Sequence, residues 1–93
     1  MAENRVVITG LGVVSPNGRN KREFAQALRD GRSGIRFHPK LRDAGFACQV
    51  GGIPENLDDL LRAHLSEEAL LTMNSGMLYA ALASIESWLD AGL

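Results

Sequence analysis

Cysteine and histidine are the residue types in this chain that could carry nucleophilic or metal chemistry, and they are few. The 93 residues include Cys48, His38 and His64. A thiolate activated by an imidazole base can attack a carbonyl carbon, whereas a structural zinc site needs about four ligands at characteristic spacing. No further ligand joins these three residues at metal-site spacing. We therefore predict no metal site, a Cys48 that packs as a small apolar side chain, and solvated histidines.

A second possible site is the glycine pair Gly10-x-Gly12, which follows an apolar run and suggests a dinucleotide-binding turn. That fingerprint, G-x-G-x-x-G, needs a third glycine and then a helix whose N-terminus binds the pyrophosphate. Here the third position is Ser15, and Pro16 follows it at once. An acidic residue about 20 positions further on is also missing from any predicted second strand. We therefore predict that the glycines belong to a loop and that the chain binds no cofactor.

Charge is distributed unevenly along the chain although its net value is −1. Residues 1–42 carry nine Lys or Arg against three acids, a net of +6, and residues 43–93 carry one Arg against eight acids, a net of −7. The two halves can attract one another within the fold, or the basic half can meet an acidic partner. Nucleic acid is excluded as a partner because no stacking aromatics are interleaved with the basic residues.

The remaining composition predicts a soluble chain in the cytoplasm. A single cysteine allows no internal disulfide, and residues 1–4 lack the basic and apolar regions of a signal peptide. No apolar run approaches the roughly 18 residues that a membrane span requires. We therefore expect no membrane partner.

The elements that must position any site begin with a strand over residues 6–14, whose continuous apolar run predicts burial on both faces of a parallel or mixed sheet. The turn residues 15–18 end it. A helix over residues 21–30 is predicted from the cap Asn20, the capping-box residue Glu23 and the C-terminal Gly31.

The second half of the chain reads as loop, short strand and helices. Residues 32–45 are predicted to form a loop, and residues 46–50 a short edge strand or part of a hairpin, ended by two glycines. Asn56 is expected to cap a helical turn over residues 57–63.

Ser66 is expected to cap one long helix over residues 67–91, and this helix is apolar nearly all round between Met77 and Ile85. Such a helix and the apolar first strand both require neighbours that the chain does not supply, because exposed sheet edges need pairing or cover. We therefore expect a fragment of a larger fold, or a piece that folds with a partner.

Four sequence blocks, in order along the chain, point to one family. They are RVVITGLGVVSP with NG at residues 5–18, FAQAL and DGRSGI at 24–35, LRDAGF at 41–46, and YAA with DAGL at 79–81 and 90–93. The first resembles the opening strand and loop of the β-ketoacyl-acyl carrier protein synthases of the I/II type, the condensing enzymes of fatty acid and polyketide synthesis. The second block resembles their first helix and the turn after it, and the fourth resembles the second helix and its C-terminal end. The third block resembles the shorter chain-elongating subtype of the family. The resemblance covers essentially the whole chain.

The resemblance implies an α/β fold of the thiolase-like class, in which each of two halves is a mixed sheet covered by helices. Residues 1–93 would be the N-terminal part of the first half. In this family a cysteine takes the acyl chain, and two histidines, or a histidine and an asparagine, assist decarboxylation of malonyl-carrier and carbon–carbon bond formation. Those residues lie further along the family's chain, so Cys48, His38 and His64 do not correspond to them. We therefore predict no catalytic, cofactor-binding or metal-binding residue here, and no condensing activity for the 93 residues unaided.

The resemblance also implies an acyl carrier protein as partner and a homodimer, or a heterodimer with another synthase-like subunit. Relatives commonly carry basic residues at the start of the second helix, where they meet the acidic carrier. Here that turn contains Glu67 and Glu68, with only Arg62 just upstream. This departure leaves two alternatives open. One is a non-catalytic subunit that resembles a chain-length factor, and the other is a self-associating interaction module.

Overall fold

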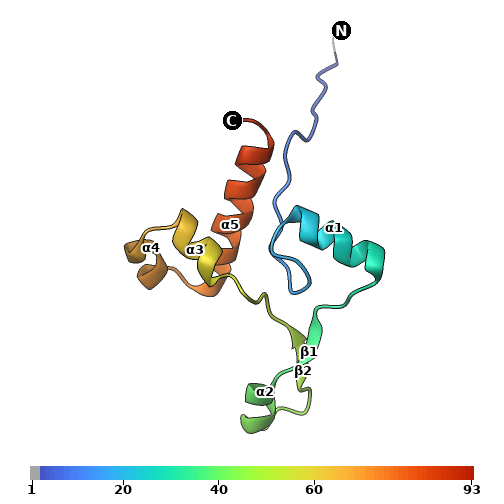
Figure 1. The fold of residues 1–93 in the computed structure, drawn as a ribbon, viewed down its shortest axis with the longest axis vertical. Helices are drawn as coiled ribbons and strands as arrows, with labels where there is room; N and C mark the ends of the chain where they lie inside the picture. Colours follow the sequence, from blue (N-terminus) through green and yellow to red (C-terminus); the bar gives the residue numbers. More distant parts are fainter. Residues whose placement is uncertain (1–2) are drawn as a thin grey trace.

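Residues 3–93 are described by a computed structural model in which a small hairpin, with a short helix at its tip, projects away from the other helices (Figure 1). The elements in chain order are α1 (Lys21–Asp30), β1 (Ile35–Phe37), α2 (Pro39–Asp43), β2 (Val50–Gly52), α3 (Asp58–His64), α4 (Glu67–Thr72) and α5 (Ser75–Asp90). The expected α/β class is therefore present only as helices with a two-stranded sheet, and no mixed sheet forms within residues 3–93.

Helix α1 confirms the prediction made from its local signals. The Asn20 side chain accepts the Glu23 backbone N–H at 2.9 Å, as an N-cap residue does. Its amide donates to the Glu23 carboxylate at 3.3 Å, a side-chain bond in place of the backbone bond of a capping box. Gly31 ends the helix in the left-handed region at φ 67°, with its N–H on the carbonyls of the last turn. Both signals act over a few residues, so no distant partner is needed to form this helix.

The predicted strand over residues 6–14 is wrong for the chain as it stands. The segment is extended but belongs to no sheet, and it runs beside α5 (Figure 1). The Leu11 N–H donates to the Asp90 carboxylate at 3.1 Å and the Val13 N–H to Glu86 at 2.9 Å. A strand is assigned by its ladder to a neighbouring strand, and within residues 3–93 no other extended segment lies against this one.

The region predicted as a loop over residues 32–45 contains a strand and a helix. Strand β1 pairs antiparallel with β2, with Ile35 opposite Gly52 and Phe37 opposite Val50. The predicted edge strand at 46–50 is therefore shifted: the ladder begins at Val50 and continues into the two glycines. Helix α2 begins with Pro39 in its first turn, where a missing N–H costs no hydrogen bond.

The long helix predicted over residues 67–91 is two helices. The Ser66 hydroxyl caps α4, accepting the Ala69 N–H at 3.2 Å as predicted. The chain then leaves the helical region at Met73, and the Asn74 side chain accepts the Met77 N–H at 2.9 Å to start α5. Asparagine competes with the helix through such bonds, which explains the break inside an otherwise continuous apolar pattern.

Helix α3 begins one residue later than predicted, and Asn56 does not cap it. Leu57 occupies the cap position without a side-chain hydrogen bond. Asn56 instead adopts the left-handed region at φ 59°, which asparagine tolerates better than most residues.

A small hydrophobic core joins α3 to α5. Leu57, Leu61 and Leu82 are buried at its centre. Partly buried side chains surround them, namely Val14, Leu60, Leu65, Leu70, Leu78 and Tyr79.

The accessible surface is large for the mass of the chain. It measures 7303 Å², whereas a compact monomer of 10.1 kDa exposes about 5,300 Å². The radius of gyration is 16.7 Å, against about 12 Å for a compact domain of this length. Apolar side chains account for part of the excess, since Val6 is 93% exposed and Leu71 87% exposed.

Candidate functional site

Cys48 and His38 lie in the hairpin, and both are engaged with its backbone. The Cys48 thiol is exposed and lies 3.6 Å from the Val50 carbonyl oxygen. The expectation that Cys48 is packed is therefore wrong. The half-buried His38 ring places Nε2 2.9 Å from the Gly51 carbonyl oxygen. The two side chains thus bind carbonyl groups of β2, and they are not hydrogen-bonded to each other.

His64 lies on a different element, at the end of α3, where it lines a cavity of about 420 Å³. Within residues 3–93 no group of three or more His, Cys, Asp or Glu side chains is placed to hold a metal ion. No helix in the described part of the chain is long and apolar enough to cross a membrane.

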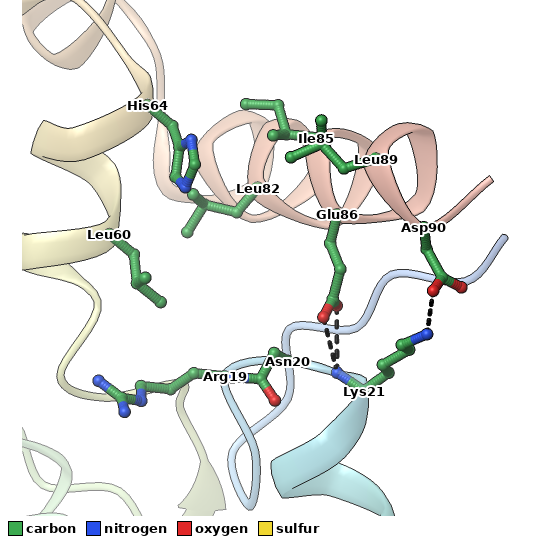
Figure 2. A pocket seen from close by; sticks show the side chains of 10 residues that line it. All are labelled: Arg19, Asn20, Lys21, Leu60, His64, Leu82, Ile85, Glu86, Leu89 and Asp90. Carbon is green, nitrogen blue, oxygen red and sulfur yellow. Dashed lines mark hydrogen bonds and ion pairs between the residues drawn. The ribbon is translucent and has the colours of Figure 1, made fainter. Parts of the chain in front are cut away.

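The cavity lies between the start of α1, helix α3 and the last turns of α5 (Figure 2). One wall is apolar and comes from α3 and α5. The opposite rim is polar and comes from α1 and the carboxylates of α5. Its lining residues are Arg19, Asn20, Lys21, Leu60, His64, Leu82, Ile85, Glu86, Leu89 and Asp90.

Glu86 joins three parts of the chain through one carboxylate. Its oxygens accept the Val13 N–H at 2.9 Å. They also accept the Lys21 N–H at 3.1 and 3.2 Å (Figure 2). Lys21 is the first residue of α1, where backbone N–H groups lack partners inside the helix and the helix dipole favours negative charge. Glu86 therefore fixes α1 and the N-terminal segment against α5.

Asp90, one turn further along α5, makes a second such link. Its carboxylate pairs with the Lys21 ammonium and accepts the Leu11 N–H. The hydrogen bond from Lys21, and next that from Leu11, hold the pKa of Asp90 below its ordinary value. We call Glu86, Asp90 and Lys21 the α5 clamp.

Gly10 and Gly12 are the residues that let the clamp form. A Cβ at Gly12 would collide with the Ala83 carbonyl oxygen and lie 2.9 Å from the Ser87 nitrogen. A Cβ at Gly10 would collide with the Ser87 carbonyl oxygen and lie 2.8 Å from the Ala91 nitrogen. The glycine pair therefore permits close approach of two backbones, and both residues lie in the extended segment rather than in a turn.

The clamp was not foreseen from the sequence, although one signal for it was present. Ala83, Ser87 and Ala91 are small residues four apart, so they form a smooth stripe along one face of α5. A stripe of this kind and a glycine pair are complementary surfaces. The Ser87 hydroxyl also donates to the Gly10 carbonyl at 3.3 Å.

These groups can orient backbone segments, but the arrangement contains no activated nucleophile. A nucleophile needs a base within hydrogen-bond reach, and in the part of the chain described here neither histidine is hydrogen-bonded to Cys48. The carboxylates of the clamp are occupied by backbone N–H groups and by Lys21.

The acidic turn singled out from the sequence lies at the start of α4. Glu67 and Glu68 occupy its first turn. A cavity of about 550 Å³ beside it is lined by Arg62, Leu65, Glu67, Leu70 and Leu71. Apolar side chains bordered by one basic and one acidic residue therefore line this cavity at the corner between α3 and α4.

Comparison with known proteins gives matches along nearly the whole chain. The sequence profile described as "Beta-ketoacyl synthase, N-terminal domain" matches residues 3–93. The chain is 38% identical over 89 residues to 3-oxoacyl-[acyl-carrier-protein] synthase 1 of Escherichia coli, covering 96% of this chain and 21% of that protein.

Two further relatives have other names. The synthase 2 of Coxiella burnetii is 32% identical over 93 residues, covering 100% of this chain and 22% of that protein. The tetracenomycin polyketide synthase ketoacyl synthase beta subunit of Streptomyces glaucescens is 36% identical over 88 residues, covering 95% of this chain and 21% of that protein. The chain thus spans about a fifth of the length of these relatives.

Proposed function

The chain belongs to the β-ketoacyl synthase family, and on this premise we propose that it is the N-terminal part of a β-ketoacyl-acyl carrier protein synthase. The whole enzyme would condense an acyl chain with malonyl-carrier in fatty acid or polyketide elongation. The match of residues 3–93 to the family's N-terminal domain carries the proposal. Residues 1–93 would then form the first part of a thiolase-like half, and the whole enzyme would act in the cytoplasm as a dimer.

The uncovered surface of the structure supports a role within a larger body. The accessible area of 7303 Å² exceeds the value for a compact monomer of this mass by about 2,000 Å². One side of a standard protein interface buries only about 800 Å². The excess includes the extended, apolar residues 6–8, which in the proposed fold would gain strand neighbours from the rest of the enzyme.

The role proposed for residues 1–93 is positioning rather than bond making. The α5 clamp holds the extended segment and the start of α1 in a fixed relation. The cysteine nucleophile, and the side chains that assist decarboxylation, would come from beyond residue 93. Cys48 takes no part, because its thiol lies against a β2 carbonyl and not against a base.

An acyl-transfer assay tests whether residues 1–93 position other groups rather than catalyse the condensation. Purified residues 1–93, supplied with acyl-carrier and malonyl-carrier, should form no 3-oxoacyl product, whereas a chain extended to the length of its relatives should form it. Turnover by the 93 residues alone would contradict the positioning role. An extended chain that folds and binds carrier but makes no product would contradict the condensing function and favour the following alternative.

The alternative is a non-catalytic subunit of a synthase heterodimer, and the acidic start of α4 favours it. Glu67 and Glu68 place two negative charges where the proposed carrier, itself acidic, would dock. Replacing both by lysine in the extended chain should strengthen carrier binding, and Glu55→Lys, in the segment before α3, is the matched control. No gain in affinity would show that the carrier does not meet this face.

A further inference from the structure

A third, polar cavity adjoins the start of α1, where Arg19 lines both this cavity and the one beside the α5 clamp. It measures about 240 Å³ and is built by segments that are distant in sequence: the turn 15–18, the start of α1, the segment 32–36 that leads into β1, and residues 55–56. Three of its lining side chains are guanidinium groups, those of Arg19, Arg32 and Arg36. This convergence of like charges is not used by the proposed condensing function.

The walls of this cavity are held by backbone contacts, so it does not depend on a ligand for its shape. A Cβ at Gly34 would lie 2.5 Å from the Pro16 carbonyl carbon and 2.7 Å from the Asn17 nitrogen, so the linker packs directly on the turn. The Asn17 side chain donates to the Arg32 carbonyl oxygen at 3.2 Å. The turn itself is closed by the hydrogen bond from Ser15 N–H to the Gly18 carbonyl at 2.8 Å.

Carboxylates pair with all three guanidinium groups, but they leave N–H donors of each group free. Arg19 Nε donates to both oxygens of Glu23, at 3.0 and 3.1 Å, and Arg36 pairs with Glu55. Arg32 pairs with Asp30 at 3.7 Å, and Asp30 does not line the cavity. Each guanidinium therefore has one carboxylate partner, and two of these three carboxylates line the cavity. Each guanidinium has five N–H donors, more than these contacts use.

We propose that this cavity binds a tetrahedral oxyanion of the phosphate class, either inorganic phosphate or the phosphate of a small monoester. Guanidinium groups bind phosphate oxygens in a bidentate manner, and here three of them converge on one space. The Arg19 guanidinium also donates to the carbonyl of Asn56 at 3.4 Å. The inference is independent of the condensing activity.

Titration with inorganic phosphate at fixed ionic strength, followed by the backbone amide resonances of residues 15, 17–19 and 32–36, tests the proposal. We expect saturable shifts in the millimolar range. Arg32→Gln should weaken binding about fivefold, the effect of one unit charge near contact distance in water. Glu55→Gln should strengthen binding by a similar factor, because it removes a competing carboxylate. Arg22→Gln, which removes the same charge from α1 outside the cavity lining, is the matched control.

Arginine modification by phenylglyoxal, mapped by mass spectrometry, gives a second readout. Phosphate should protect Arg19, Arg32 and Arg36, and leave Arg22 and Arg29 reactive. Glycerol phosphate distinguishes the two ligand sources: equal affinity assigns the cavity to the phosphate group itself, and tighter binding assigns it to monoesters.

Three results would overturn the proposal. They are no saturable binding, equal weakening by Arg22→Gln and Arg32→Gln, or a Glu55→Gln variant that binds no more tightly than the unmodified chain.

Discussion

Replacing Gly12 by alanine is the sharpest test of how the N-terminal segment is held. The added Cβ would lie 2.7 Å from the Ala83 carbonyl carbon and 2.9 Å from the Ser87 nitrogen, and closer still to the Ala83 oxygen. Ordinary carbon contacts begin near about 3.5 Å, so the segment must move away from α5 by about 1 Å. Such a shift breaks the bond between the Val13 N–H and Glu86.

The magnitude follows from three contributions. Overpacking costs about 1–3 kcal/mol, and loss of one hydrogen bond to a partly buried carboxylate costs about 1 kcal/mol more. The lower entropy of the unfolded alanine variant offsets about 0.4–1 kcal/mol. We expect the free energy of unfolding to fall by about 2 kcal/mol, which for a domain of this size lowers the melting temperature by about 10 °C.

Urea unfolding followed by circular dichroism measures this change, and hydrogen exchange at the Val13 amide locates it. Gly51→Ala is the matched control, because the nearest atom to its added Cβ is His38 Cδ2 at 3.9 Å, an ordinary contact. The reasoning fails if Gly12→Ala unfolds within about 0.5 kcal/mol of the unmodified chain, the range of neutral surface substitutions. It also fails if the Val13 amide keeps its protection.

Three further predictions concern the clamp and the core. Glu86→Gln should reduce hydrogen-exchange protection at the Val13 and Lys21 amides by about tenfold, because one charged hydrogen bond is worth about 1.5 kcal/mol. Unchanged protection at both amides would contradict the bridging role of Glu86. The pKa of Asp90 is held below its ordinary value, first by Lys21 and then by Leu11, so its stabilising effect is present above the ordinary carboxylate range and is lost as the pH falls through the lowered pKa. The free energy of unfolding, measured from about pH 5 downward, should therefore depend less on pH in Asp90→Asn. Identical pH profiles would refute this linkage. Leu82→Ala, at the centre of a small core, should cost about 2–3 kcal/mol in urea unfolding, and a loss below about 1 kcal/mol would mean that the α3–α5 contact is not the main core.

Sequence reasoning succeeded where the structure is fixed by neighbouring residues. Asn20, Glu23 and Gly31 define α1 through bonds that span a few positions, and Ser66 starts α4 in the same way. It failed where the outcome depends on distant partners or on competition between local signals. The run at 6–14 has strand composition but finds no ladder partner within residues 3–93. The Asn74 cap divides an apolar pattern that periodicity alone predicts to be one helix.

The clamp was missed for a related reason. Glu86 and Val13 are separated by 73 positions, and nothing in their types indicates that a carboxylate on a helix accepts a backbone N–H of an extended segment. The Gly-x-Gly pair is visible in the sequence, but the close backbone approach that it permits is evident only once the small-residue face of α5 lies opposite it. The dinucleotide fingerprint, in contrast, can be judged from adjacent residues alone, because Ser15 stands at the position of its third glycine and Pro16 follows.

The way the N-terminal segment is held also affects how the isolated chain behaves at high concentration. Residues 10–13 are tied to α5, while the stretch from Val6 to Ile8 is β-branched, extended and open to solvent. An unpaired strand of this kind is a template for edge-to-edge stacking between molecules. Arg5 is the charge that opposes such stacking, because a flanking charge acts as a gatekeeper against aggregation. The residues best suited to the centre of a sheet are therefore the aggregation hazard of the chain on its own.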